Sequence, residues 1–376
     1  MKVAIVHEWL ANMGGSEKVV LALKEIFPDA PIYTTVYNPD KVDPAFLSMD
    51  IRTSFIQRLP MAKTKYQSYL PLMPTAVEQF DLSEYDVVLS SSHAVAKGVV
   101  TGAKTLHITY CHTPMRYAWD FYHEYLNGQG VGRLKKMLIP WLMNYIRIWD
   151  RLSADRVDYF IANSRYVAQR IKKHYRREAE VIYPPVDTRY FSEADKENGG
   201  PERDNEGFFF IVSRLIPYKR IDLAVEAFNR LGLPLKIAGD GPEKERLQAM
   251  ANGNIQFLGR ISDREMRHHY ASCLAFLFPG EEDFGITPVE AQAAGRPVIA
   301  YGAGGCLETV MPGVTGEFFA SQTADALAEV IRRFDPAKYR PEQIRAHAGQ
   351  FDREIFKRRI KDFVESKYEE FLRNRG

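Results

Sequence analysis

Cysteine is scarce in this sequence of 376 residues, which contains only Cys111, Cys273 and Cys306. The count is odd and no two of them stand in a CxxC spacing, so neither a disulfide framework nor a zinc site is expected. The opening segment MKVAIVHEWL has a strand-like pattern and no signal-peptide cleavage pattern. We therefore expect a protein of the reducing cytoplasm.

Long apolar runs are also missing, since no stretch reaches the roughly 18 apolar residues that a membrane span requires. The G-x-G-x-x-G fingerprint of nicotinamide-binding domains is absent, which counts against a dehydrogenase. A net charge of +2 gives no reason to expect a nucleic-acid partner. Hydrophobic residues nevertheless make up 45% of the chain, and a chain of this length has material for two well-cored domains.

Charge is unevenly distributed along the chain. Residues 133–177 contain twelve Lys or Arg and three Asp, a local charge of +9, which leaves about −7 for the rest. This polarity predicts one face that meets an anionic partner.

Short apolar runs alternate with helical patterns almost throughout, which predicts doubly wound parallel α/β sheets. The segment 183–207 is rich in Pro, Gly and charge and is predicted to be an interdomain linker. We expect two similar α/β domains with a cleft between them, and an apolar-faced helix over 353–374. The expected strands are 2–7, 85–91, 105–112 and 159–164, then 208–215, 233–241, 255–260, 273–279 and 296–301, with clear helical patterns at 16–27 and 164–175.

Several loops at expected strand ends carry candidate ligand-binding residues, because ligands bind there in open parallel sheets. Gly14 and Gly15 follow the first strand and lead into a helix, which suits an anion but also suits a plain turn. Arg214 and Lys219 follow the first strand of the second half, where two cations suit a diphosphate.

His112 ends another expected strand and can hydrogen-bond a sugar hydroxyl or a phosphate. The segment after it supplies an aromatic wall with polar tips, as carbohydrate binding requires, although core packing explains it equally well. Its candidate acceptor-binding residues are Arg116, Tyr117, Trp119 and Asp120.

The stretch EEDFGITPVE contains two glutamates, Glu282 and Glu290. TPVEAQAAG predicts a short helix with Thr287 as N-cap and Glu290 closing a capping box, which is a purely structural role for Glu290. Glu282 lies in the preceding loop and has no such role. Two glutamates without a His or Asp cluster do not make a metal site, whereas the spacing alone leaves open a glycosidase-type acid/base pair.

These motifs together resemble retaining glycosyltransferase family 4. SRLIPYKRID, IAGDGPEKERL, the run from FLGRISDREM through GEEDFGITPVEAQAAGRPVIAYGAGGCLETV, and GVTGEFF occur in that family's order. The similarity is dense over residues 180–320 and looser in the first half, where GGSEKVV and YCHTP are the similar pieces.

The resemblance implies a GT-B fold of two Rossmann-like domains facing a central cleft. Residues 1–183 are then an acceptor-binding domain, 184–352 bind the nucleotide sugar, and a carboxy-terminal helix within 353–376 crosses back to the first domain. The donor is a substrate, and no cofactor or catalytic metal is implied.

The resemblance also implies individual roles. Arg214 and Lys219 neutralise the donor diphosphate, Glu282 binds hydroxyls of the transferred sugar, and Glu290 binds the ribose. The sugar-side histidine matches His112, which completes a catalytic set with Glu282, Arg214 and Lys219. Further donor contacts come from the Gly14–Gly15 turn and from backbone N–H groups around Phe284, Gly285, Ile286 and Thr287.

Within the family, CHTPMRYAWD and IPYKRID are most similar to bacterial mannosyltransferases that build O-antigen and exopolysaccharide units from GDP-mannose. We therefore expect mannosyl transfer to a saccharide acceptor, with UDP-sugar-dependent transfer as the alternative. A two-domain nucleotide-sugar epimerase and a binding protein without turnover remain as further classes.

The segment 133–152 mixes basic residues with Trp141, Tyr145 and Trp149, and 56–74 has similar character. Either peripheral attachment to an anionic membrane, where a lipid-linked acceptor would be met, or packing on the first domain explains this pattern. Both hold if the helix packs one face and displays the other. Our hypothesis is attachment at the cytoplasmic face of the plasma membrane.

Overall fold

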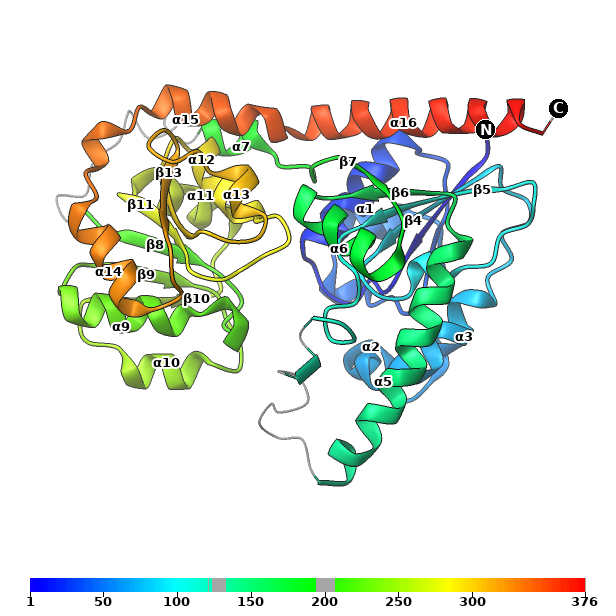
Figure 1. The fold of residues 1–376 in the computed structure, drawn as a ribbon, viewed down its shortest axis with the longest axis horizontal. Coiled ribbons are helices and arrows are strands. Elements are labelled where there is room, and N and C mark those ends of the chain that lie inside the picture. The colour runs from blue at the N-terminus through cyan, green and yellow to red at the C-terminus, as the bar shows by residue number, and fades with distance from the viewer. Residues whose placement is uncertain (121, 124–132, 194–206, 376) are drawn as a thin grey trace. The chain divides into compact units, whose positions relative to one another are not determined.

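The computed structural model describes residues 1–120, 122–123, 133–193 and 207–375. The chain forms two compact units (Figure 1). Unit 1 comprises Met1–Tyr183 together with Phe356–Gly376, and unit 2 comprises Pro184–Ile355.

Unit 1 is built on a seven-stranded sheet in the order β3-β2-β1-β4-β5-β6-β7, and every neighbouring pair is parallel. The sequence predicted β1, β4, β5 and β6 and missed the others, which have only three residues each and so carry little periodic signal. The strands are β1 (Val3–His7), β2 (Ile32–Thr34), β3 (Ile51–Thr53), β4 (Val87–Ser92), β5 (Leu106–Cys111), β6 (Tyr159–Ala162) and β7 (Ala179–Val181).

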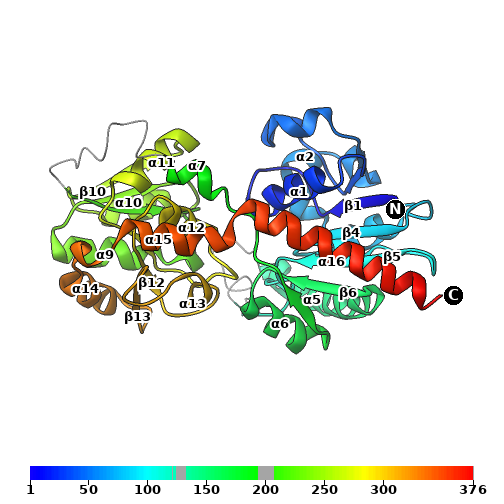
Figure 2. The same cartoon turned by 90° about the horizontal axis from the view of Figure 1, so that it is seen from above.

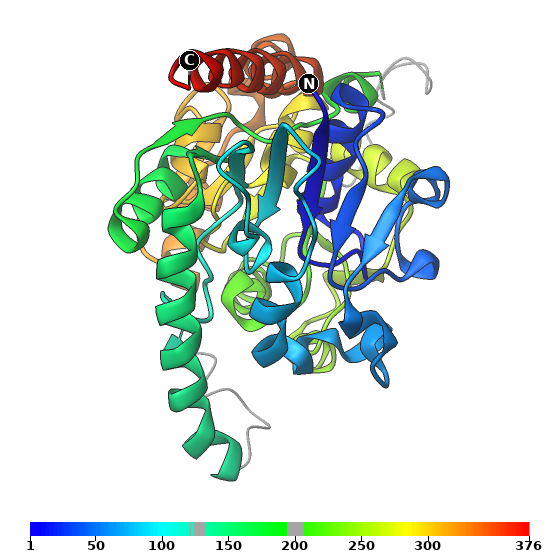
Figure 3. The same ribbon diagram turned by 90° about the vertical axis from the view of Figure 1, so that its right-hand side faces the viewer.

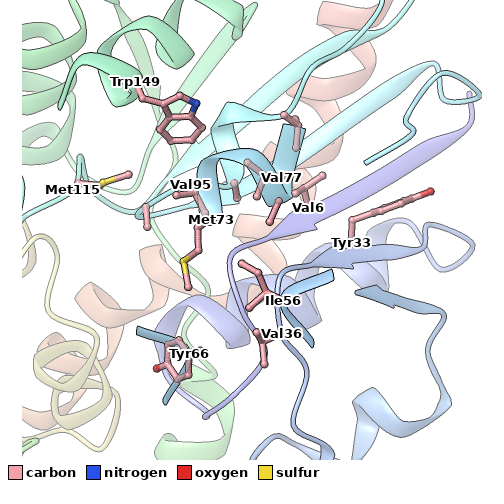
Figure 4. Packing of buried hydrophobic residues seen from close by; sticks show 14 of the residues in the cluster. Val6, Tyr33, Val36, Ile56, Tyr66, Met73, Val77, Val95, Met115 and Trp149 are labelled. Atoms are coloured by element: carbon pink, nitrogen blue, oxygen red, sulfur yellow. The ribbon is translucent and has the colours of Figure 1, made fainter. Parts of the chain in front are cut away.

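Successive residues of a strand point to opposite faces of the sheet, so each buried strand presents apolar side chains to both faces, and helices cover both. In β1, Val3 and Ile5 join the core under α1 and α16, whereas Ala4 and Val6 join the core under α3 and α5. Figure 4 shows members of the second core, among them Val6, Val77 of α3 and Trp149 of α5. The helices of unit 1 are α1 (Gly15–Ile26), α2 (Ala62–Lys65), α3 (Met73–Glu78), α5 (Arg133–Ser153), α6 (Arg165–Tyr175) and α16 (Arg353–Arg373).

The helix α16 packs on unit 1, as the family resemblance implied (Figure 2). Phe356, Ile360 and Val364 are buried in the same core as α1. Each such side chain contributes roughly 1.5–3 kcal/mol by leaving water. Lys357 also pairs with Glu25 of α1 at 3.2 Å.

The long helix α5 packs one face on the sheet, and its amino-terminal half extends beyond the rest of unit 1 (Figure 3). The inner face includes Trp149, which is 8% exposed and donates its indole N–H to Glu78 at 2.8 Å. Asp150, also inward, pairs with Lys97, and both side chains are buried. The aromatic residues of this segment are therefore divided, as expected if the helix packs one face and displays the other: Trp149 faces inward, whereas Trp141 is 77% exposed.

Unit 2 has a six-stranded sheet in the order β10-β9-β8-β11-β12-β13, again parallel throughout. Its strands are β8 (Phe209–Val212), β9 (Leu235–Ala238), β10 (Ile255–Gly259), β11 (Ala275–Phe278), β12 (Val298–Tyr301) and β13 (Gly316–Phe319). Its helices are α7 (Thr188–Ser192), α9 (Ile221–Leu231), α10 (Lys244–Met250), α11 (Asp263–Ser272), α12 (Ile286–Ala293), α13 (Cys306–Thr309), α14 (Ala324–Arg333) and α15 (Pro341–Ala348).

The predicted linker over 183–207 is wrong for its first part. Val186 and Phe191 are buried, and Thr188 begins the helix α7, which packs against α12. The backbone of Val186 also exchanges hydrogen bonds with Phe351 and Arg353 of the same unit. The start of this charged, Pro-rich segment therefore packs on unit 2 through two buried apolar side chains. Residues 194–206 of the predicted linker lie outside the described residues.

Candidate functional site

Each sheet has one point where the strand order reverses, and ligands of open α/β sheets bind outside the strand ends at such a point. In unit 1 the reversal falls between β1 and β4, and in unit 2 between β8 and β11.

In unit 2, the loop after β8 carries Arg214 and Lys219. Arg214 is exposed, and within the described part of the chain no carboxylate forms an ion pair with it. Lys219 ends the short turn Pro217–Lys219 and forms an ion pair with Glu282, which follows β11. The two side chains are 18% and 16% exposed, so their charges interact with limited screening by water. The structure therefore places the predicted phosphate ligand beside the predicted sugar ligand.

The loop that carries Glu282 is held by three glycines that allow close backbone contact. A Cβ on Gly280 would lie 3.0 Å from the Lys219 Cα, and one on Gly305 would lie 2.3 Å from the Phe284 Cα. Gly304 is equally tight, because its Cβ would lie 2.4 Å from the Glu282 carbonyl oxygen. The Gly305 N–H donates to that carbonyl at 2.8 Å. Sequence reasoning missed these anchors, although GAGG after an expected strand was a usable signal.

The capping-box prediction for α12 is wrong. The helix begins at Ile286 with Gly285 as N-cap, and no side chain caps it. Gly285 has φ 89°, a left-handed conformation that starts the helix two residues earlier than predicted. Pro288 then falls in the first turn, where its missing N–H removes no intrahelical bond. Gly295 follows the end of the helix with φ 81°, where the sequence placed it.

Glu290 therefore lies in the body of α12 rather than at its start, and it is 3% exposed. Its carboxylate accepts a hydrogen bond from Tyr270 at 3.1 Å. At the helix start, the side chain of Phe284 is buried against Phe351, with ring centroids 5.5 Å apart. The predicted donor contacts at Gly285, Ile286 and Thr287 fall at the first turn of α12, whose backbone N–H groups have no intrahelical partner.

In unit 1, His112 directly follows β5, and its Nε2 lies 2.8 Å from the Ser91 hydroxyl of β4. Burial, together with the charges of His93 and His7, lowers the pKa of His112 to about 3. The ring is therefore neutral at physiological pH. Gly14 is the N-cap of α1 with φ −159°, an ordinary extended conformation, and Gly15 is its first helical residue.

Four titratable residues that the sequence did not single out surround the reversal point of unit 1. They are His7, Glu8, Glu17 and His93. Glu8 is fully buried, and one carboxylate oxygen accepts hydrogen bonds from the Ser92 hydroxyl and the backbone N–H groups of His93, Ala94 and Ala96. Burial alone would raise the pKa of Glu8, but His93, His7 and these bonds lower it to about 2. The only indication of this cluster in the sequence was the pair His7–Glu8 at the end of a predicted strand.

The predicted acceptor segment is largely occupied within unit 1. Trp119 donates its indole N–H to Asp150 at 2.7 Å and stacks on His174 at 4.8 Å. Asp120 accepts from Arg170 Nε at 3.0 Å and contacts His174 at 3.2 Å. Arg116 and Tyr117 are partly buried beside them. Core packing, the alternative given above, thus accounts for the polar groups of Trp119 and Asp120.

No cluster of three or more His, Cys, Asp or Glu residues suited to a metal ion occurs among the described residues. Over the same residues, no helix combines the length and apolar character needed to cross a membrane. The three cysteines are buried and form no disulfide among the described residues.

Comparison with protein-family models matches residues 13–190 to Glycosyltransferase Family 4 and residues 192–348 to Glycosyl transferases group 1. Two parallel-sheet α/β units, each with one reversal of strand order, are the architecture of the GT-B fold. The chain belongs to glycosyltransferase family 4, as the sequence motifs indicated.

Several curated relatives are mannosyltransferases. The alpha-1,3/1,6-mannosyltransferase of Mus musculus is 26% identical over 86% of this chain and 85% of its own length. A GDP-mannose-dependent phosphatidylinositol monomannoside mannosyltransferase of Corynebacterium glutamicum is 30% identical over 46% of this chain. The chain spans 64% of the Dictyostelium discoideum relative and 52% of the Corynebacterium protein, less than two thirds of each.

Solved structures share the fold along nearly the whole chain. The Anabaena protein HepE in complex with UDP superposes with a TM-score of 0.70 at 19% identity, covering 97% of this chain and 100% of HepE. The sucrose-phosphate synthase of Thermosynechococcus elongatus gives a TM-score of 0.75 at 17% identity, covering 98% of this chain and 99% of that protein. At these identities the likeness establishes the GT-B fold alone.

Proposed function

We propose that this glycosyltransferase is a retaining, metal-independent enzyme that transfers mannose from GDP-mannose to a lipid-linked saccharide in bacterial polysaccharide or lipopolysaccharide biosynthesis. The observation that carries the proposal is the Lys219–Glu282 pair at the strand-order reversal of unit 2. A donor diphosphate bound to Lys219 would have its sugar within reach of Glu282. This arrangement suits cleavage of the bond between sugar and phosphate.

The chemistry requires stabilisation of the departing diphosphate. Lys219 and Arg214 supply positive charge, and the first turn of α12 supplies backbone N–H groups. The acceptor hydroxyl attacks from the face that the diphosphate leaves, and the departing phosphate takes the hydroxyl proton. No protein carboxylate is needed as nucleophile, which leaves Glu282 to orient the sugar hydroxyls and Glu290 to bind the ribose.

The names of the relatives support mannose as the transferred sugar, since several are described as mannosyltransferases and four bacterial ones as GDP-mannose-dependent. UDP-sugar transfer is the second candidate, and the UDP complexes of HepE favour it. An epimerase shares the two-domain architecture but needs no acceptor.

Thermal-shift measurements with GDP-, UDP- and ADP-sugars test the donor. Stabilisation by GDP-mannose alone is expected, whereas stabilisation by UDP-sugars alone would overturn that assignment. Incubation with the donor in the absence of acceptor separates the classes, because an epimerase would convert the sugar and a transferase would only hydrolyse it slowly. Transfer should also persist in EDTA, and its loss would contradict metal independence.

Membrane attachment is part of the proposal and rests on α5. Its outer face carries an apolar stripe formed by Leu138, Trp141, Tyr145, Ile148 and Leu152, which are exposed and recur at steps of three and four residues. A Trp and a Tyr in such a stripe suit the interface of a bilayer. Flotation with anionic liposomes at low salt tests the attachment, and absence of binding would contradict it.

A further inference from the structure

A continuous set of buried polar contacts links His112 to the first turn of α1. Ser91 Oγ lies 2.8 Å from His112 Nε2 and 3.2 Å from His7 Nδ1. His7 Nε2 in turn lies 3.5 Å from Glu17 Oε1. His7, Ser91 and Glu17 are all buried, at 0%, 0% and 5% exposure, so water does not compete for these contacts.

The acceptors around His7 fix its protonation. Its Nδ1 lies 3.1 Å from the Ser91 carbonyl oxygen, which can only accept a hydrogen bond. Its Nε2 faces the Glu17 carboxylate, which also accepts. Both ring nitrogens therefore carry protons, and His7 is an imidazolium. Burial lowers the pKa of His7, but the Glu17 hydrogen bond and the charges of Glu17 and Glu8 outweigh burial and raise it.

The charge on His7 then sets the direction of the next hydrogen bond. The Nδ1–H of His7 is shared between the carbonyl and hydroxyl oxygens of Ser91, so the hydroxyl accepts on this side. The Ser91 hydroxyl therefore donates its single proton in a hydrogen bond to His112 Nε2. A neutral imidazole that accepts at Nε2 carries its proton on Nδ1.

We infer that Glu17, His7 and Ser91 are positioning residues for His112: they hold its Nε2 as an acceptor and keep its proton on Nδ1, the donor that the ring offers to a ligand. That His112 contributes to transfer rests on the proposed function, whereas its tautomer does not. The lowered pKa of His112 agrees with a neutral ring.

The chain offers a matched control in the neighbouring serine. Ser90 is also fully buried in β4, and its hydroxyl lies 2.9 Å from Nε2 of another buried histidine, His107, and 2.6 Å from the Thr109 hydroxyl. Ser91→Ala and Ser90→Ala remove the same atom from the same strand. Only the first change touches His112.

The test is ¹⁵N NMR of the full-length protein with labelled histidine, with the His112 signals assigned by their loss in His112→Asn. The wild type should show a neutral His112 protonated on Nδ1. This tautomer should be lost or mixed in Ser91→Ala and in Glu17→Gln, and kept in Ser90→Ala. An Nε2-protonated His112 in the wild type, or an unchanged tautomer in Ser91→Ala, would overturn the inference.

Kinetics give the second readout. In Ser91→Ala, kcat should fall about tenfold or more with the donor KM nearly unchanged, because orientation of a reacting contact rather than donor binding is lost. Restoration of the hydroxyl by Ser91→Thr should recover most of kcat, and equal losses in Ser90→Ala and Ser91→Ala would show a general structural effect instead. If the tautomer responds as expected but the wild type turns over no donor, the proposed function fails, whereas the positioning of His112 by Glu17, His7 and Ser91 stands.

Discussion

Lys219 and Glu282 form an ion pair between the loops that follow β8 and β11, the two strands at which the sheet order of unit 2 reverses. The contact joins a cation suited to phosphate with a carboxylate suited to sugar hydroxyls. The ion pair brings the motifs IPYKRID and GEEDFG together in space, although they lie far apart in the sequence.

Glu282→Ala should abolish transfer and leave the affinity for free GDP equal or higher, because Lys219 loses a competing anion. Isothermal titration with GDP and a transfer assay measure the two effects. Glu226→Ala is the control, since it breaks an exposed ion pair with Arg230 on α9 and should change neither. Weaker GDP binding in Glu282→Ala would mean that Glu282 contacts the nucleotide rather than the sugar.

Gly305→Ala should displace the Glu282 loop. The new Cβ would lie 2.3 Å from the Phe284 Cα and 2.6 Å from the Asp283 carbonyl oxygen, and backbone cannot yield as a side chain can. We expect a loss of about 1–3 kcal/mol in the free energy of unfolding and a clear rise in donor KM. Gly253→Ala has nothing within 4 Å and serves as the control. Normal kinetics in Gly305→Ala would show that the loop is not held by this contact.

Asp150→Ala should destabilise unit 1 by about 3–5 kcal/mol, because it leaves Lys97 charged and buried. It also removes the acceptor of Trp119 and Tyr175. Asp155→Ala, on the turn just after the same helix, breaks only the partly exposed pair with Arg151 and should cost less than about 1 kcal/mol. Denaturant unfolding measures both variants, and similar midpoints would contradict a stabilising role for the buried pair.

Glu8→Gln should alter how stability depends on pH. The folded pKa of about 2 lies below the usual glutamate value of 4.5, so the ionised carboxylate stabilises the fold above pH 4.5. That contribution, about 3 kcal/mol from the size of the shift, is lost as pH falls from 4.5 towards 2. Urea unfolding at pH 7, 4 and 3 should therefore show wild type and variant converging in acid. If the difference in free energy of unfolding between wild type and variant were the same at all three pH values, the lowered pKa of Glu8 would be contradicted.

Trp141→Asp and Ile148→Asp on the outer face of α5 should each reduce binding to anionic liposomes several-fold, because each removes apolar surface from the bilayer contact. Leu47→Asp is the control, since Leu47 is 64% exposed on another part of unit 1. Sedimentation with vesicles measures the effect. Equal losses in all three variants would point to net charge rather than to the stripe.

The two α/β units, most strands and the helix α16 could be predicted because buried strands and amphipathic helices leave periodic patterns. The GT-B fold and the docking of α16 on unit 1 followed from the family resemblance instead. Strands of three residues, such as β2 and β7, leave none. The start of α12 was missed because Gly285 in a left-handed conformation overrides the signal of Thr287 and Pro288. The sequence could not show that Trp149 points inward while Trp141 points outward, because both are tryptophans of the same helix.

Within the candidate site, the sequence found residues whose neighbours form recognisable motifs, such as Lys219 and Glu282. It missed Glu8, Glu17 and His7, because their significance comes from burial beside one another. Burial of several charges is a property of the fold: α1 brings Glu17 to His7 at the end of β1, and the loop after β4 brings His93 to Glu8.

The position of α16 constrains how the protein is made. The core of unit 1 includes Phe356, Ile360 and Val364, so this core is completed by residues that follow unit 2 in the chain. During synthesis, the amino-terminal sheet must wait for all of unit 2 to emerge before this core closes. A chain cut before α16 would leave unit 1 with an uncovered apolar surface, so native folding of unit 1 depends on synthesis having passed unit 2.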